Sequence, residues 1–328
     1  MDQENKVLRF GAAVILCAIV FRLLSSGVFA PVAEFLRQPR AVAFLMFLET
    51  GRSIRLSDDT EVPGWTAESP APGQLFEKPA AAPVFAAQDL ELVKLKNAVS
   101  YQPDLEDLLT APVSLNLKSG EPAVLILHSH ATESYTKTAG QRYTESSAYR
   151  TLDEDYNLIR VGEELAGKLE DAGIRVIHDR TLHDYPSYND SYSHSRASVQ
   201  RYLTEYPTID LVLDIHRDAA DTASGQLATY VSNGDCEAAQ LMLVMGTGAN
   251  GQSHPHWRQN LSLALKIQVQ LERLFPGICR PMSLRGSRFN QDLHPNMLLV
   301  EVGAAGDTLE EALAAIDPLA QAIISLSE

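Results

Sequence analysis

Residues 121–135, EPAVLILHSHATESY, join a short buried segment to side chains that bind metals. Residues 123–127 form an unbroken apolar run, which is typical of a strand buried on both faces of a sheet, although a buried helix gives a similar pattern. The run ends at His128 and His130, and Glu133 follows. Open α/β sheets bind ligands at the carboxyl ends of such strands. Because imidazole and carboxylate together suit Zn²⁺, the stretch predicts part of a zinc site.

The chain beyond residue 121 alternates apolar runs with amphipathic helical patterns, which indicates α/β architecture. Thr151 and Glu154 have the form of a capping box that opens a helix, and Gly173 ends it. The β-branched run 174–177 predicts the next strand. Because such a unit joins parallel strands, we expect a mostly parallel sheet flanked by helices. Further strands are expected at 209–215, 226–231, 241–245 and 297–302, and further helices at 197–206, 260–274 and from 308 onward.

Two more buried strands carry side chains that suit the same chemistry. The run 209–215 leads directly into His216, and Glu301 lies within LLVEV. Parallel strands bring their carboxyl ends to one edge of a sheet, where these side chains are expected to meet. Catalytic zinc usually has three protein ligands, and a separate carboxylate moves the proton. We predict His130, Glu133 and His216 as zinc ligands, and Glu301 as the general acid and base.

Two carboxylates compete for the third ligand position. Glu133 lies next to the His-Ser-His sequence, but a Glu in such a loop is often solvated or caps a helix. Asp153, near the expected start of a helix, is the rival. His128 and His130 share one side of the chain if the strand continues, so that one ligates and the other supports it. We assign His130 as the ligand because His128 lies closer to the buried strand.

His216 has charged neighbours on both sides. Asp214 or Asp218 is expected to fix the tautomer of the imidazole. Arg217 is predicted to hold a substrate carboxylate bidentately, and the alternative is an ion pair with one of these aspartates.

Glu301 interrupts an apolar strand, where a carboxylate is costly to bury without a role or a partner. The structural alternative to catalysis is an ion pair with Arg285 or Arg288. We expect the catalytic role because the strand would deliver Glu301 to the same region as His216.

The N-terminal part of the chain differs from the rest in composition. Residues 10–33 are mostly apolar behind a basic flank, which predicts a single transmembrane helix with the remainder outside the cytoplasm. A cleaved signal peptide is the alternative, although Pro31 follows its cleavage box. Residues 87–96 have the pattern of a short helix or strand. The expected divisions are an anchor with its flanking apolar segment at 1–52, a Pro- and Ala-rich linker at 53–110, and a catalytic domain at 111–328.

Charge and motifs exclude several classes of protein. The 328 residues carry a net charge of −15, which argues against nucleic acid as a partner, because phosphate binding needs clustered Lys and Arg. No CxxC pair is present, which excludes zinc knuckles and thioredoxin-type motifs. The sequence also lacks GxSxG and a P-loop, so the corresponding serine hydrolase and nucleotide functions are not expected.

Six stretches in order carry a resemblance to a known family. They are HSHATESY (128–135), YNLIRVGEEL (156–165), HDYPSYNDSYSHSR (183–196), LDIHRDA (213–219), RFNQDLHPN (288–296) and LLVEVG (298–303). Together they resemble the stage II sporulation protein P family from about residue 121 to the C-terminus. Because the six occur together and in order, the signal is more specific than any one of them.

The resemblance implies a membrane-anchored, zinc-dependent peptidoglycan hydrolase related to the N-acetylmuramoyl-L-alanine amidases. It implies cleavage of stem peptides from glycan strands at the septum during engulfment, and an endopeptidase activity on peptide cross-links. Its implied partners are peptidoglycan, a lytic transglycosylase of the sporulation stage II D family and a further membrane engulfment protein.

The amidase pattern carries over to His130, His216 and Glu301. His-Ser-His replaces the Asp-Pro-Gly-His loop of the amidases, and their Glu ligand falls near Asp153, so the carboxylate ligand stays open between Asp153 and Glu133. The alternative function is a non-catalytic, membrane-tethered murein-binding scaffold. A different metal hydrolase acting on the same polymer, such as a deacetylase, is a third hypothesis, because metal chemistry does not name the bond that is cut.

Overall fold

A computed structural model describes residues 82–113, 115–222, 225–232 and 237–327. The described residues belong to one compact unit of the chain. The predicted membrane anchor and the first half of the predicted linker, residues 53–81, lie outside the described residues. Within the described part, no helix is long and apolar enough to cross a membrane.

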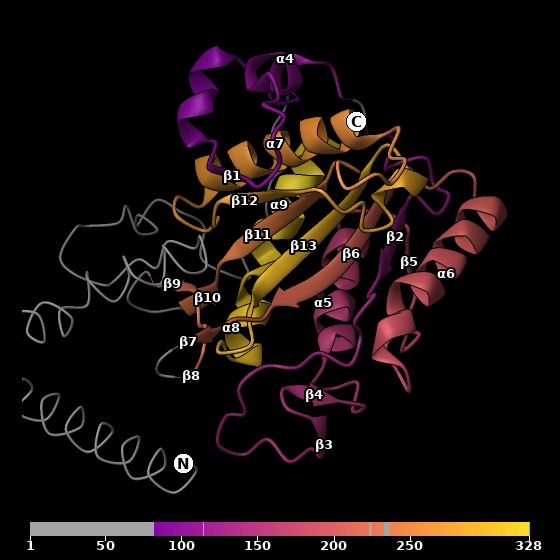
Figure 1. Ribbon diagram of the computed structural model, residues 1–328, viewed down its shortest axis with the longest axis vertical. Coiled ribbons are helices and arrows are strands. Elements are labelled where there is room, and N and C mark those ends of the chain that lie inside the picture. Colours follow the sequence, from indigo (N-terminus) through magenta and orange to yellow (C-terminus); the bar gives the residue numbers. More distant parts are fainter. Residues whose placement is uncertain (1–81, 114, 223–224, 233–236, 328) are drawn as a thin grey trace, which may run out of the picture. The chain divides into compact units, whose positions relative to one another are not determined.

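The centre of the structure is a seven-stranded sheet in the order β1-β12-β11-β13-β6-β2-β5. Every neighbouring pair is parallel except β11 and β13, which are antiparallel. The prediction of a mostly parallel sheet is therefore confirmed. Strand β6 lies between β13 and β2 and is parallel to both, so the carboxyl ends of these three strands lie at the same edge (Figure 1).

The seven strands of this sheet have these bounds: β1 Leu95–Asn97, β2 Val124–Leu127, β5 Val176–His178, β6 Leu211–Asp218, β11 Leu241–Gly246, β12 Met282–Arg285 and β13 Met297–Ala304. Three small hairpins accompany it: β3 Glu145–Ser147 with β4 Arg150–Thr151, β7 Asp221–Thr222 with β8 Gly225–Gln226, and β9 Tyr230–Ser232 with β10 Glu237–Ala239. The α-helices are α4 Leu105–Thr110, α5 Leu158–Asp171, α6 Ser191–Glu205, α7 Trp257–Leu274, α8 Leu309–Ala314 and α9 Ile316–Leu326. The 3₁₀ helices are η1 Ala87–Leu92, η2 Tyr188–Asp190 and η3 Gln291–Leu293.

The two faces of the sheet are covered unequally. Helices α5, α7 and α9 pack over one face around a single large apolar core, to which β2 contributes Val124 and Ile126. The alternate residues Leu125 and Leu127 point the other way and pack against Val199 of α6. Among the described residues, α6 and the short helix η3 pack on this second face near β6 and β13.

Helix α5 begins later than the sequence pattern predicts. The predicted capping box at Thr151 and Glu154 is wrong, because Thr151 lies in the β3–β4 hairpin and donates its hydroxyl to Thr144 O at 2.8 Å. Asn157 is the cap instead, since its Oδ1 accepts from Ile159 N at 2.9 Å. The helix expected from residue 308 onward is confirmed, and Thr308 opens it in a capping box with Glu311.

Part of the predicted linker belongs to the folded sheet. Leu95–Asn97 form β1, which pairs in parallel with β12, and α4 packs against α7. The described part of the predicted linker, residues 82–110, is therefore folded against the rest of the domain.

Candidate active site

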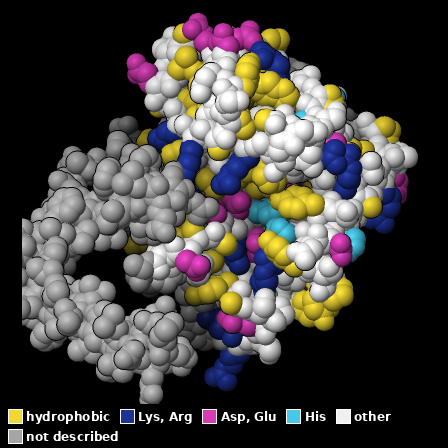
Figure 2. Space-filling view, in the orientation of Figure 1, with side chains coloured by type: hydrophobic (Ala, Val, Ile, Leu, Met, Phe, Trp, Pro, Cys, Tyr) yellow, Lys and Arg dark blue, Asp and Glu magenta, His cyan; other side chains and the backbone are white. Residues whose placement is uncertain are grey.

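Three predicted site residues meet on the second face of the sheet. Residues Asp214 and His216 are two positions apart on β6, so their side chains share that face. In the parallel register of β6 and β13, Glu301 is the direct partner of His216. The ring of His130 approaches His216 edge-on, with 5.3 Å between ring centroids. In Figure 2, histidine and acidic side chains meet in the middle of this face.

His216 is fixed from one side by a buried carboxylate. Its Nε2 lies 2.9 Å from Asp214 Oδ1, at ion-pair distance although not in good hydrogen-bond alignment. Asp214 is itself held, because Ser129 donates its N–H at 2.8 Å and its hydroxyl at 2.6 Å. Burial lowers the pKa of His216, but Asp214, Glu301 and Glu133 together outweigh it and raise the pKa to about 9. The other nitrogen, Nδ1, faces Glu133 Oε2 at 4.0 Å.

His130 lies in the turn after β2 under an aromatic cover. The exposed ring of Tyr188 stacks on it at 4.4 Å, and Tyr192 approaches it edge-on at 5.5 Å. Its Nδ1 is buried and has no hydrogen-bond partner. Burial first, and His216 second, lower the pKa of His130 to about 3. A neutral imidazole with a free nitrogen is the form that binds metals.

Glu133 is buried and is held by two arginines. Its Oε1 lies 3.1 Å from an Arg150 nitrogen and 3.8 Å from an Arg217 nitrogen. Arg217 is buried too, and it donates to Ser134 O and Tyr149 O at 2.8 Å each. This placement argues against the predicted contact of Arg217 with a substrate carboxylate, because its donors serve the loop around Glu133.

The two residues weighed as alternatives lie away from these groups. Asp153 is exposed, and its Oδ1 accepts from Asp155 N at 3.2 Å within a local turn. His128 points toward α5, where its Nε2 lies 2.9 Å from His178 Nε2, while its Nδ1 lies 3.0 Å from Ile215 O. The strand ends at Leu127, so His128 and His130 do not share a side as the pattern predicted.

Glu301 is not paired with either arginine that the sequence offered. Arg285 donates to Ser283 Oγ at 2.8 Å, and Arg288 lies 3.5 Å from Asp292. The Oε2 atom of Glu301 is buried without a hydrogen-bond partner. Burial raises the pKa of Glu301 to about 8, although His216 opposes the shift. A carboxyl group of this kind carries a proton near neutral pH and can act as an acid.

Several residues around the site were not predicted. Arg150 bridges Glu133 and Asp184, whose oxygen it meets at 2.6 Å, and its guanidinium lies 4.6 Å over the ring of Tyr188. Tyr192 covers His216, with 6.3 Å between nearly parallel rings. The tyrosine-rich composition of residues 185–195 was the only sequence signal for this aromatic cover.

The donor side chains were compared with the needs of a zinc ion. Among the described residues, no group of three or more His, Cys, Asp or Glu side chains already has the geometry of a metal site. In their chemistry the donors fit zinc, because His130 Nδ1 is unpartnered and His216 Nδ1 faces a carboxylate oxygen of Glu133. His216, whose pKa is raised to about 9, would release its proton when the metal binds. The contact of His216 with Asp214 has the form that orients metal-binding histidines. Glu133 would exchange part of its arginine contact for the metal.

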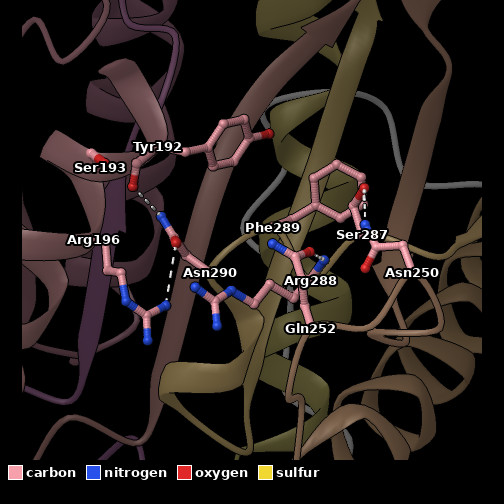
Figure 3. A pocket seen from close by; sticks show the side chains of 9 residues that line it. All are labelled: Tyr192, Ser193, Arg196, Asn250, Gln252, Ser287, Arg288, Phe289 and Asn290. Atoms are coloured by element: carbon pink, nitrogen blue, oxygen red, sulfur yellow. Dashed lines mark hydrogen bonds between the residues drawn. The ribbon is translucent and has the colours of Figure 1, made fainter. Parts of the chain in front are cut away.

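A hollow of about 340 Å³ adjoins these residues, separated from His216 by the ring of Tyr192 (Figure 3). Its walls come from the start of α6, the loop after β11 and the turn before η3. The volume lies within the usual range for small-ligand pockets. The lining residues are Tyr192, Ser193, Arg196, Asn250, Gln252, Ser287, Arg288, Phe289 and Asn290.

Fold and site define a mixed α/β protein whose neighbouring parallel strands deliver two imidazoles and two carboxylates to one place. The model of the stage II sporulation protein P family matches residues 75–324, and the chain belongs to this family. The predicted resemblance is therefore confirmed. The stage II sporulation protein P of Bacillus subtilis (strain 168) is 25% identical over 268 residues, which are 78% of this chain and 60% of that protein. The chain thus spans about 60% of the length of this curated relative.

Solved structures with a similar arrangement are N-acetylmuramoyl-L-alanine amidases. The enzyme AmiC2 of Nostoc punctiforme is 10% identical with a TM-score of 0.37, covering 61% of this chain and 94% of its own. The enzyme of Clostridium difficile 630 is 17% identical with a TM-score of 0.36, covering 63% and 97%. Ami1 of Mycobacterium smegmatis is 12% identical with a TM-score of 0.38, covering 64% and 98%. Likenesses this distant do not bear on the activity of this chain.

Proposed function

We propose that this chain is a sporulation peptidoglycan hydrolase that cleaves the amide bond between N-acetylmuramic acid and L-alanine with the help of zinc. The observation that carries the proposal is the convergence of His130, His216 and Glu301 at the carboxyl ends of three neighbouring parallel strands. Family membership supports the same substrate.

His130, His216 and Glu133 would hold the zinc ion, and the zinc would polarise the amide carbonyl and activate water. Asp214 keeps Nδ1 of His216 directed away from itself and toward Glu133. Arg150 and Arg217 set the position of the Glu133 carboxylate.

Glu301 would act as the proton carrier. Its raised pKa makes the carboxylate a stronger base, so that it can take the proton released by the attacking water and then give it, through the unpartnered Oε2, to the leaving amine of L-alanine. A permanent ion pair would prevent this, which is why the absence of contact with Arg285 and Arg288 in the described structure supports the role.

The setting of the reaction is part of the proposal. We infer that the N-terminal segment anchors the protein in the membrane with the catalytic domain outside the cytoplasm. Cleavage of peptide cross-links and assembly with a stage II D family lytic transglycosylase and a further membrane engulfment protein are inferred from the family alone. A membrane-tethered murein-binding scaffold is the competing function.

The test measures zinc and products on the same preparation of the full chain, purified in detergent. Bound zinc is quantified, and the protein is incubated with purified peptidoglycan whose released products are identified by mass. We expect about one zinc per chain and free stem peptides beginning with L-alanine, with product release reduced by about 10²–10⁴-fold in Glu301→Gln. The exposed Glu170→Gln in α5 is the matched control and should keep full activity. The absence of both bound zinc and released products would favour the scaffold.

A further inference from the structure

The hollow beside the candidate active site combines an aromatic wall with a pair of arginines. Tyr192 and Phe289 form the wall, with 6.1 Å between their ring centroids, and Tyr192 also covers His216. A group bound in the hollow would therefore lie one aromatic ring away from the reacting bond.

The turn that builds this hollow is held in an unusual backbone shape. Phe289 and Asn290 both have left-handed backbone angles, with φ values of 49° and 58°. Non-glycine residues rarely adopt this conformation, and where they do, it is often at a ligand site. Asn290 Nδ2 ties the turn to α6 by donating to Tyr192 O at 2.9 Å and Ser195 Oγ at 3.1 Å.

The opposite side of the turn is fixed to the sheet. Gln291 accepts from Gly246 N and donates to Val244 O, both at 2.8 Å. Gly246 is required there, because a Cβ at this position would collide with Ser287 O. The turn is therefore rigid before any ligand arrives, which reduces the entropy lost on binding.

The charges in the hollow do not balance. Arg196 satisfies Asp292 in a bidentate pair at 2.9 and 2.8 Å. Arg288 reaches the same carboxylate only through Nε, at 3.5 Å, and its side chain is about one-third exposed (31%). Two guanidinium groups thus share one carboxylate, and Arg288 is one of the side chains that line the hollow, so a second carboxylate bound there would complete its pairing (Figure 3).

We propose that the hollow is a subsite for the acidic stem peptide, in which Arg288 binds a side-chain or α-carboxylate one or two residues beyond the scissile amide. This inference rests on the proposed function, because it places the scissile bond at His216 and Glu301. Tyr192 and Phe289 pack against the peptide backbone and its methyl groups, while Arg288 selects for the free acid over the carboxamide.

The experiment measures binding by calorimetry with the full chain carrying Glu301→Gln, so that no turnover occurs. The probes are N-acetylmuramoyl-L-alanyl-D-glutamate and the same compound with both glutamate carboxyls converted to carboxamides. The acid should bind about tenfold more tightly, the effect of one charge-assisted hydrogen bond. Adding Arg288→Gln should abolish the preference and leave binding of the carboxamide unchanged, whereas Arg288→Lys should restore part of it.

Arg175→Gln is the control, because Arg175 is exposed beside β5 and donates to Gly120 O outside the hollow. It should keep the full preference for the acid. The subsite is refuted if the Glu301→Gln protein binds the two probes equally, or if the protein that also carries Arg288→Gln still prefers the acid. The proposed function is judged separately from the mass of products released by the protein with Glu301 intact, so failure of one proposal does not hide failure of the other.

Discussion

Glu301 and His216 are register partners on adjacent parallel strands, so a carboxyl group and an imidazole lie side by side on one face of the sheet. The backbone ladder of β6 and β13 sets this relationship, and side-chain flexibility plays little part in it. Asp214, two residues before His216, shares the face and holds the imidazole from behind. The site is therefore built on the most rigid element of the fold, as a preorganised catalytic site requires.

Asp214→Asn should weaken zinc binding without unfolding the protein. The amide keeps the shape of the side chain but removes the charge that orients His216. We expect a loss of about 10- to 100-fold in zinc affinity, which is typical when a group that orients a metal ligand is changed. The measurement is a competition titration of zinc against a chelating dye. The exposed Asp171→Asn is the control and should bind zinc as the parent does. Equal affinities for the two variants would remove Asp214 from this role.

Arg150→Met should destabilise the fold far more than the loss of a surface arginine. Arg150 contacts the buried carboxylates of Glu133 and Asp184, and its loss removes the ion pair of Asp184 and leaves Glu133 with only the more distant Arg217. We expect a decrease of about 3 kcal/mol in the free energy of unfolding. The control is Arg180→Met. Because Arg180 pairs with Glu154 at the surface, its loss should lower the free energy of unfolding by less than about 1 kcal/mol. Urea denaturation of both variants measures the difference, and similar losses would contradict it.

Two glycines of α5 should respond to alanine with opposite signs. A Cβ on Gly162 would lie 2.5 Å from His128 Nε2 and 2.6 Å from His178 Nε2, so Gly162→Ala must displace the histidine pair. We expect a loss of about 1–3 kcal/mol. Nothing lies within 4 Å of a Cβ on Gly167, and Gly167→Ala should stabilise the helix by about 0.5–1 kcal/mol. Thermal denaturation of the two variants tests this, and a gain for both would show that the histidines move easily.

The sequence was enough to predict a mostly parallel sheet, the strand that leads to His130 and the strands that carry His216 and Glu301. Each strand is an apolar run that ends at, or is interrupted by, a polar residue. Because these strands are buried on both faces of the sheet, the pattern can be recognised in the sequence. Strand β12 was not expected, and the strand expected at 226–231 does not belong to the seven-stranded sheet. The start of α5 was misplaced because Thr151 and Glu154 satisfy a local rule that the β3–β4 hairpin overrides.

The surroundings of the site were beyond prediction from the sequence for a different reason. Arg150 meets Asp184 across 34 positions of the chain, and the stacking of Tyr188 on His130 depends on where α6 docks. Such contacts follow from tertiary packing and leave no periodic trace. The same limit explains why Arg217 was expected at a substrate, whereas the fold turns it inward toward Glu133.

Lys266 of α7 predicts how stability depends on pH. It is buried and donates to Leu108 O at 3.0 Å and Ser262 Oγ at 2.8 Å, and burial lowers its pKa from 10.5 to about 8. Between these two pH values the unfolded chain binds the proton and the folded chain does not. The contribution of Lys266 to the free energy of unfolding therefore rises with pH from about 8 to 10.5, by at most about 1.4 kcal/mol per pH unit.

Lys266→Met should flatten this part of the stability curve, because the methionine cannot take up a proton in either state. The measurement is the free energy of unfolding from urea titrations at several pH values between 8 and 10.5, for the parent and the variant. Lys118→Met, at an exposed position, should keep the slope of the parent. The loss of two hydrogen bonds lowers the stability of Lys266→Met at every pH, so the slope is the test. Parallel curves for parent and variant would mean that Lys266 stays protonated in the folded protein.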